Sequence, residues 1–158
     1  MIIIRLILPI LILLSVFSCR KERNSANNLN RGNGTWLVES IQIEEFDTLG
    51  NLVLDTTYVN YGEMIFLKSA WGTTNTYFGK FIRFNNDGTS EIGATQYEAD
   101  SKIVYIDSWD PFFTDAYNQD KDGTRNQEWR ATRYFTSQHY DNRIQQIKTV
   151  KLNKGKSF

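Results

Sequence analysis

The chain has 158 residues, with 18 basic and 18 acidic side chains, one histidine and one cysteine, and this length fits a single domain with a tail. The first 18 residues are mostly hydrophobic, so the other 140 carry 17 basic against 18 acidic groups and 21 aromatic residues. That charge balance excludes the basic face that a nucleic-acid-binding protein needs, and the aromatic content excludes wholesale disorder because it can form a core.

The first 18 residues predict a secretory signal peptide. One basic residue, Arg5, precedes an apolar run over residues 6–16, which has the length of a signal-peptide core. A transmembrane helix needs about 20 apolar residues to cross the hydrocarbon layer, and this segment is shorter. We therefore expect residues 1–18 to be removed after export.

The residues at the end of the apolar run indicate a lipid anchor. Val16, Phe17, Ser18 and Cys19 resemble the lipobox of bacterial lipoproteins, in which the cysteine receives a thioether-linked lipid and becomes the first residue of the mature chain. The resemblance implies that Cys19 carries the anchor, palmitate included, and holds the protein in the outer membrane, on either its periplasmic or its surface face. The alternative is a free thiol after an ordinary signal peptide. Because Cys19 is the only cysteine, the chain has no internal disulfide.

Residues 19–34 predict a flexible tether. Residues 20–34 contain five asparagines, and their only apolar members are Ala26 and Leu29. Such a composition does not favour a packed face, so we expect the folded domain to occupy residues 35–158.

From Thr35 onward, short β-like runs alternate with turn sequences, which predicts an all-β antiparallel meander. The strongest hairpin signal is the Asn-Asn-Asp-Gly sequence at residues 85–88. The expected strands are residues 36–46, 52–59, 63–68, 76–84, 89–93, 102–107, 127–136 and 143–152. This pattern predicts an antiparallel up-and-down β-barrel of about eight strands, or a barrel-like sandwich.

Two of the expected strands are apolar on both faces, at residues 64–67 and 103–106. A strand with one wet face should alternate apolar and polar residues. We therefore expect these strands to lie under a second layer, to line a wide apolar interior, or to meet a partner.

Three short motifs resemble the lipocalin family. Gly34, Thr35 and Trp36 match its Gly-x-Trp strand start, residues 114–117 (Thr-Asp-Ala-Tyr) are similar to its Thr-Asp-Tyr loop, and Arg143 lies near its conserved arginine. The resemblance implies an eight-stranded barrel that Trp36 closes at one end, with Arg143 packed on that tryptophan. With the lipobox and the Asn-rich tether, the chain looks like the lipocalin-like lipoproteins of Bacteroidota. Only 15 residues follow Arg143, so we do not expect the C-terminal helix of lipocalins here.

Residues 118–123 resemble the start of a calcium-binding loop, with Asn118, Asp120 and Asp122 at alternate positions before Gly123. The glutamate that should close such a loop is replaced by Trp129, and a hairpin turn explains the Asp-Gly pair equally well. We expect no calcium site.

The sequence offers little for catalysis. His139 is the only histidine, so a histidine-based metal site or histidine pair cannot form, and it lies in a polar turn sequence. We expect no catalytic residue, no metal and no cofactor, and hence a protein that is not an enzyme.

Aromatic residues in and beside the two long loop regions are the candidate ligand-binding residues, with a role in the core as the alternative. They are Trp71, Tyr77, Trp109, Phe112 and Tyr117. The function expected first is binding of a small apolar ligand or envelope component by the barrel. The alternative is a protein-binding lipoprotein, an inhibitor or an assembly accessory, that uses an exposed β face. We expect a monomer with a lipid anchor in the membrane and no nucleic-acid partner.

Overall fold

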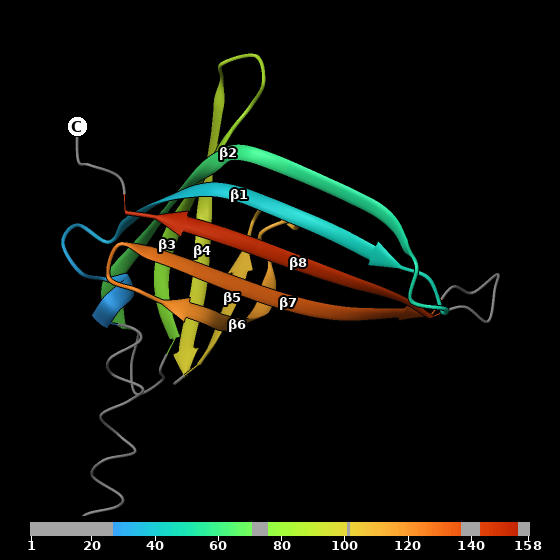
Figure 1. Cartoon of the computed structure of the whole chain (residues 1–158). Helices are drawn as coiled ribbons and strands as arrows, with labels where there is room; N and C mark the ends of the chain where they lie inside the picture. Colours follow the sequence, from blue (N-terminus) through green and yellow to red (C-terminus); the bar gives the residue numbers. More distant parts are fainter. Residues whose placement is uncertain (1–26, 71–75, 101, 137–142, 155–158) are drawn as a thin grey trace, which may run out of the picture.

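The computed structural model describes residues 27–70, 76–100, 102–136 and 143–154. Eight antiparallel strands form a closed barrel in which each strand pairs with the next and β8 pairs with β1 (Figure 1). The strands are β1 (Thr35–Phe46), β2 (Leu52–Ala70), β3 (Thr76–Phe84), β4 (Ser90–Asp100), β5 (Ile103–Ser108), β6 (Asp115–Asp122), β7 (Asn126–Thr136) and β8 (Arg143–Asn153). The expected all-β up-and-down barrel is confirmed.

Strand β2 replaces two expected strands. The prediction of separate strands at residues 52–59 and 63–68 is wrong, because β2 runs through Asn60 and Gly62 without a break. Asn60 takes a positive φ of 48°, and Gly62 pairs with Val38 of β1 and Arg83 of β3. A Cβ atom at Gly62 would clash with the carbonyl oxygen of Ile82. These two residues, which usually favour turns, here bend a continuous strand and let β3 approach it.

The structure differs from the expected strands at two further places. β6 was not predicted, and β4 continues to Asp100 instead of ending at Gly93. Both strands bury alternate residues, Thr95 and Tyr97 in β4 and Tyr117 and Gln119 in β6. The buried threonine and glutamine hide the alternation of hydrophobicity that marks a strand in a sequence.

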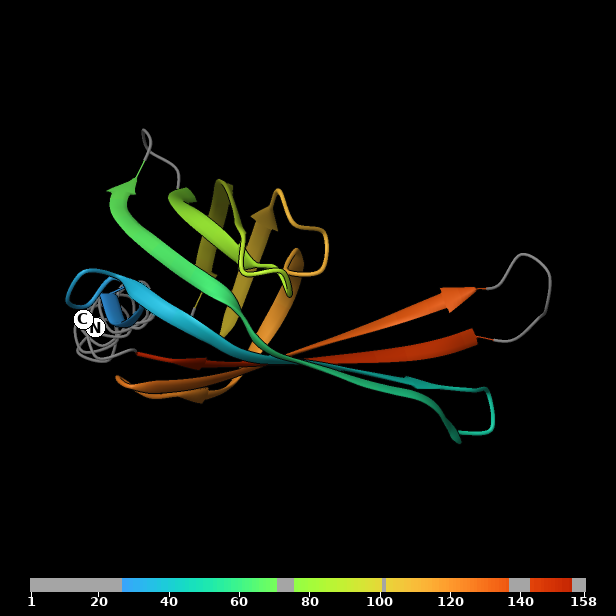
Figure 2. The same ribbon diagram turned by 90° about the horizontal axis from the view of Figure 1, so that it is seen from above.

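Four strands continue past the barrel as a projecting sheet (Figure 2). The pairing of β2 with β3 stops at Gly62, and that of β6 with β7 stops at Arg130. Beyond those points β1, β2, β7 and β8 pair only with one another, in the order β2-β1-β8-β7. We call this sheet the extension; it consists of residues 41–46, 52–61, 131–136 and 143–148.

The barrel interior is filled by the chain's own aromatic side chains. The rings of Phe81 and Phe113 stack with centroids 4.5 Å apart, and Phe66 meets Tyr97 edge to face at 4.8 Å. The largest fully buried aromatic side chains are Trp36, Phe66, Phe81, Tyr97, Phe113, Tyr117 and Trp129. Rings in such contact make the barrel a packed core.

The segment before β1 closes one end of the barrel, so the prediction of a flexible tether is wrong for residues 27–34. Residues 27–29 form a helical turn, and the Leu29 side chain is fully buried in the core. The Tyr97 hydroxyl donates a hydrogen bond to Asn30 Oδ1 at 2.9 Å. The buried Leu29 side chain and this hydrogen bond anchor the segment at the end of the barrel. Within the described residues, no helix is both long and apolar enough to span a membrane.

Trp36 lies at this closed end, but Arg143 does not pack on it. Antiparallel pairing sets Leu37 of β1 opposite Asn153 of β8, whereas Arg143 pairs with Thr136 at the far end of the extension. The cation over the Trp36 ring is Lys154, whose Nζ lies 5.0 Å from the ring centroid. The expectation for Arg143 is therefore wrong, since β8 runs the full length of the extension.

The two strands that are apolar on both faces line the interior with only one of their faces. Met64, Phe66, Val104 and Ile106 are buried, whereas Leu67 and Tyr105 on the opposite faces are exposed. The structure places no second layer of described residues over those outer faces.

Candidate functional site

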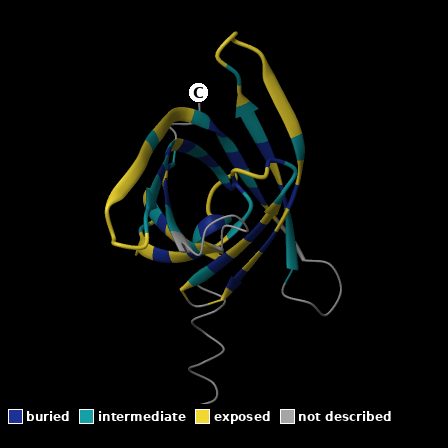
Figure 3. Cartoon of the chain, turned by 90° about the vertical axis from the view of Figure 1, so that its right-hand side faces the viewer, coloured by how far each residue is buried: buried dark blue, intermediate teal, exposed yellow. Residues whose placement is uncertain are grey.

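Most of the exposed large hydrophobic side chains of the described residues lie on the extension and its β1–β2 turn. Val59 is 69% exposed, Tyr134 68% and Leu49 85%. The others in this region are Leu52, Val53, Leu54, Tyr58 and Phe135. In Figure 3 the first part of β2 appears as a long exposed stretch beside the better-covered β1. Exposed apolar side chains gathered on one element mark an interaction surface.

The inner face of the extension continues the interior surface of the barrel. Ile41, which is buried, pairs with Val150 and Tyr58, and the next inward residue, Ile43, pairs with Lys148 and Thr56. Residues paired across an antiparallel sheet share a face, so these side chains lie on one surface.

The β5–β6 loop faces this surface and leaves a trough of about 260 Å³ between them. We define the trough by its lining residues, Ile43, Pro111, Phe112, Arg133, Phe135, Gln146 and Lys148. Its walls are apolar at Ile43, Phe112 and Phe135, and its charged groups come from β7 and β8.

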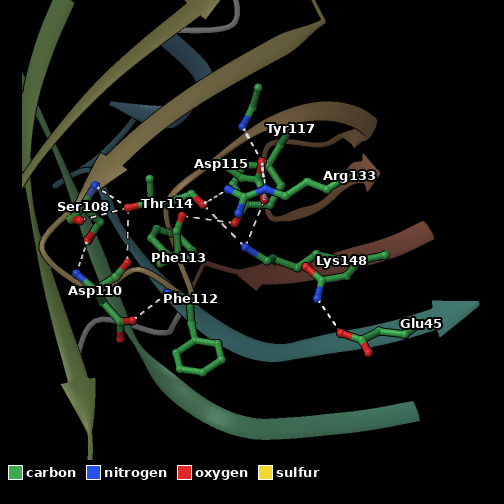
Figure 4. A network of polar contacts seen from close by, with 12 residues as sticks. Glu45, Ser108, Asp110, Phe112, Phe113, Thr114, Asp115, Tyr117, Arg133 and Lys148 are labelled. Atoms are coloured by element: carbon green, nitrogen blue, oxygen red, sulfur yellow. Dashed lines mark hydrogen bonds and ion pairs between the residues drawn. The ribbon is translucent and has the colours of Figure 1, made fainter. Parts of the chain in front are cut away.

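Two cations beside the trough share one carboxylate. Lys148 of β8 and Arg133 of β7 both point at Asp115 (Figure 4). Lys148 Nζ lies 3.0 Å from Asp115 Oδ2, and Arg133 Nε lies 2.9 Å from the same oxygen. The side chains of Lys148 and Asp115 are 4% and 8% exposed, whereas that of Arg133 is 41% exposed. Arg133 is thus the cation that solvent or a ligand can reach.

Burial shifts the pKa of Lys148, which lines the trough, and of Tyr117 next to it. Removal from water lowers the pKa of Lys148, and the contact with Asp115 opposes that change. Lys148 Nζ also lies 5.8 Å from the centre of the Tyr117 ring. Burial raises the pKa of Tyr117 well above its usual value, so its hydroxyl stays protonated and donates to the Phe113 carbonyl at 3.1 Å.

The β5–β6 loop is held in place by polar contacts at its base. The Thr114 hydroxyl accepts from the Ser108 amide at 2.9 Å and donates to the Ser108 carbonyl at 2.9 Å. Asp110 is fully buried, and it accepts from the Tyr61 hydroxyl and the Phe112 amide, each at 2.9 Å. Because the loop is fixed, the trough is pre-formed.

The predicted ligand-binding aromatics do not come together in one pocket. Tyr117 is fully buried, Tyr77 stacks on Tyr97 with centroids 5.2 Å apart, and Trp109 donates from Nε1 to the Phe81 carbonyl at 3.0 Å. Phe112 is exposed and lines the trough. Trp71 lies outside the described residues.

Sequence reasoning missed the charged residues of this site. Arg133, Lys148 and Asp115 come from three strands, and none of them stands out in the sequence. The one available signal is the Thr-Asp-Ala-Tyr sequence at 114–117, which contains Asp115 and Tyr117.

Asn118, Asp120 and Asp122 of the calcium-like sequence lie in strand β6. Asp120 forms an ion pair with Arg130 at 3.4 Å, and Asp122 accepts from Gln127 at 3.1 Å. The described residues contain no group of three or more acidic, histidine or cysteine side chains that could hold a metal ion.

We predict that calcium does not stabilise the fold. Millimolar calcium should leave the melting temperature unchanged, because Asp120 and Asp122 already have protein partners and lie on an extended strand. Thermal unfolding with calcium and with a chelator checks this. A melting temperature that rises with calcium and falls with the chelator would contradict it.

The comparisons with known proteins identify no family for this chain. No family model and no curated protein matches this chain. Among solved structures, it is similar to one described as a redesigned beta barrel, b11L5F_LGL, at 13% identity and a TM-score of 0.37. That match covers 76% of this chain and 92% of the other. The chain is an eight-stranded antiparallel β-barrel protein.

Proposed function

We propose that this protein is an exported, lipid-anchored lipoprotein that binds a partner protein of the cell envelope through the inner face of the extension. One observation carries the proposal: the barrel interior is occupied by its own rings, while the inner face of the extension leaves the side chains of Leu54, Tyr58 and Phe135 exposed to solvent. This favours the protein-binding alternative over a ligand held inside the barrel.

The trough indicates what kind of segment would bind. Phe112 and Phe135 supply apolar surface, and both are about half exposed, at 46% and 42%. Arg133 can turn a guanidinium group toward the trough while Lys148 keeps its contact with Asp115. A partner segment with an apolar side chain next to a carboxylate would fit these groups.

A small apolar ligand in the same trough is the second candidate. The volume of about 260 Å³ and the walls formed by Ile43, Phe112 and Phe135 support it. That volume lies just below the range of about 300–1,000 Å³ typical of small-molecule sites, which places this candidate second.

Site-specific photocrosslinking tests the proposal. A photoreactive amino acid would replace Phe135 in the full chain, expressed in the organism that encodes it, and adducts would be identified by mass spectrometry. The matched control is Ile92, which is 63% exposed on β4, a strand that is not part of the extension. We expect a protein adduct from position 135 and none from position 92.

The other outcomes separate the candidates. Lipid or metabolite adducts alone at position 135 would reject the protein partner and support the small ligand. Equal labelling at positions 135 and 92, or no adduct at either, would reject both.

The anchor is tested by a separate variant. Cys19→Ala should prevent acylation and release the protein from membranes, because a single lipidated residue would be its only attachment. Membrane fractionation and mass spectrometry of the mature N-terminus measure this. A variant that stays in the membrane with Met1 intact would indicate an uncleaved anchor.

A further inference from the structure

The first part of β2 is a free sheet edge. Residues 52–60 pair with β1 on one side, and pairing with β3 on the other side begins only at Gly62. Among the described residues no strand lies along that second side. The backbone N–H and C=O groups that point away from β1 are therefore available to another strand.

This edge lacks the features that usually prevent strand addition. Residues 52–59 contain no proline, glycine or lysine, and their one charge is Asp55. Asp55 Oδ1 accepts from Gln42 on β1 at 3.0 Å. Between Leu54 and Val59 the pairing with β1 is regular, without a bulge. A long apolar edge of this kind favours edge-to-edge association.

The other edge of the extension, β7 from Ala131 to Thr136, is less suited to pairing with a copy of itself. It is shorter than the β2 edge, and it carries a cationic side chain, Arg133, which disfavours edge-to-edge pairing. We therefore expect association at β2.

We propose that the β2 edge pairs antiparallel with the same edge of a second copy of this chain, centred on Thr56. In this register Val53 lies opposite Val59 of the other copy, Leu54 opposite Tyr58, and Asp55 opposite Thr57. No like charges face each other, and the Val53–Val59 pairs join β-branched residues of high β propensity. A twofold contact repeats each of these pairs.

A concavity beside the edge fits the same arrangement. Where β2 separates from β3, the residues that line a cavity of about 660 Å³ include Tyr58, Asn60, Phe84, Asn85 and Asn86. In the proposed register the other copy's β2 begins beside Asn60, so its β1–β2 turn enters this cavity. That turn carries Leu49, which is 85% exposed.

The dimer would join two extensions into one eight-stranded sheet with two inner faces. A monomer was expected from the sequence, because a free edge can be recognised only once the strand order is known. This inference concerns the edge of the extension and does not depend on what binds in the trough.

Cysteine crosslinking of the full chain tests the register. Thr56→Cys should form a disulfide-linked dimer on mild oxidation, because the two Thr56 Cα atoms would lie about 4.5–5.5 Å apart. Thr57→Cys is the matched control: its two copies would be diagonal neighbours roughly 7–8 Å apart, beyond easy disulfide reach. The unsubstituted chain controls for Cys19.

Light scattering of the detergent-solubilised chain tests the contact without crosslinking. We expect the mass of two chains, and Val59→Lys should raise the dissociation constant roughly tenfold or more, since two Val–Val pairs are lost. Tyr134→Lys, an equally exposed position on β7, should leave it unchanged. Circular dichroism confirms that both variants are folded.

Three results would overturn the inference: a monomer over the whole concentration range, equal crosslinking from positions 56 and 57, or a dimer that Tyr134→Lys weakens and Val59→Lys does not. A monomeric chain that still gives a protein adduct at position 135 would reject the dimer and leave the proposed function standing. A dimer that gives no protein adduct at position 135 would reject the proposed function and leave the dimer standing.

Discussion

Replacing Trp36 by alanine is expected to lower the free energy of unfolding by about 3–5 kcal/mol. The Trp36 ring is fully buried, and its Nε1 donates to the Leu29 carbonyl at 2.8 Å. The substitution removes the ring that closes this end of the barrel and leaves the Leu29 carbonyl without that donor. A domain of this size has a total stability of about 5–15 kcal/mol, so the variant should be badly destabilised.

Urea denaturation of the full chain measures this effect, with two comparison variants. Trp36→Phe keeps most of the ring volume but loses the Nε1 donor, and it should cost roughly 1–3 kcal/mol. Trp71→Ala should cost under about 1 kcal/mol, as expected from the polar residues around it in the sequence. If Trp71→Ala were more damaging than Trp36→Ala, the assignment of Trp36 as the residue that closes the barrel would be wrong.

The strands that end at clear turn sequences, rich in Asp, Asn and Gly, could be predicted from the sequence. Asp47 to Asn51 and Asn85 to Thr89 form turns in which Gly50 and Gly88 adopt a φ of 82°. Side-chain caps by Asp47 and Asp87 reinforce them. Such turns are local, so β1 and β3 end as expected.

The extension could not be predicted, because it depends on strand order. Nothing in the sequence local to Leu54 or Tyr134 indicates that the neighbouring strand ends early. Only the register shows that β3 joins β2 at Gly62 and that β6 leaves β7 at Arg130. The length of a strand beyond the barrel is a tertiary property.

The charged groups of the site could not be predicted for a related reason. In a sequence, Lys148 is a lysine between Ile147 and Thr149 and would ordinarily lie in solvent. In the fold it lies on the inward face of β8, with its side chain only 4% exposed. Its burial is compensated by Asp115, a residue 33 positions away.

Replacing Asp115 by alanine is the second large expected effect, at about 3–5 kcal/mol of unfolding free energy. It leaves the Lys148 ammonium buried, with the Thr114 carbonyl at 3.5 Å and the Tyr117 ring as its nearest partners. An uncompensated buried charge is more costly than the loss of an exposed ion pair. Arg133 can move into water, because its side chain is 41% exposed.

Lys148→Met is the matched control and should lower the free energy of unfolding by about 1 kcal/mol or less, because Asp115 keeps Arg133 at 2.9 Å and the methionine fills the same space.

The Asp115→Ala and Lys148→Met variants should also differ in how their stability depends on pH. In Asp115→Ala the folded-state pKa of Lys148 falls further below its unfolded value, so the unfolded chain binds more protons between those two values. The stability of Asp115→Ala relative to the unsubstituted chain should therefore recover as the pH rises through the lowered folded-state pKa of Lys148 toward the ordinary pKa of lysine, because Lys148 then loses its proton in the folded state. Lys148→Met has no such group and should show no recovery. Urea denaturation at several pH values distinguishes the two cases, and an Asp115→Ala deficit that stays constant with pH would mean that Asp115 acts through packing and not through the charge of Lys148.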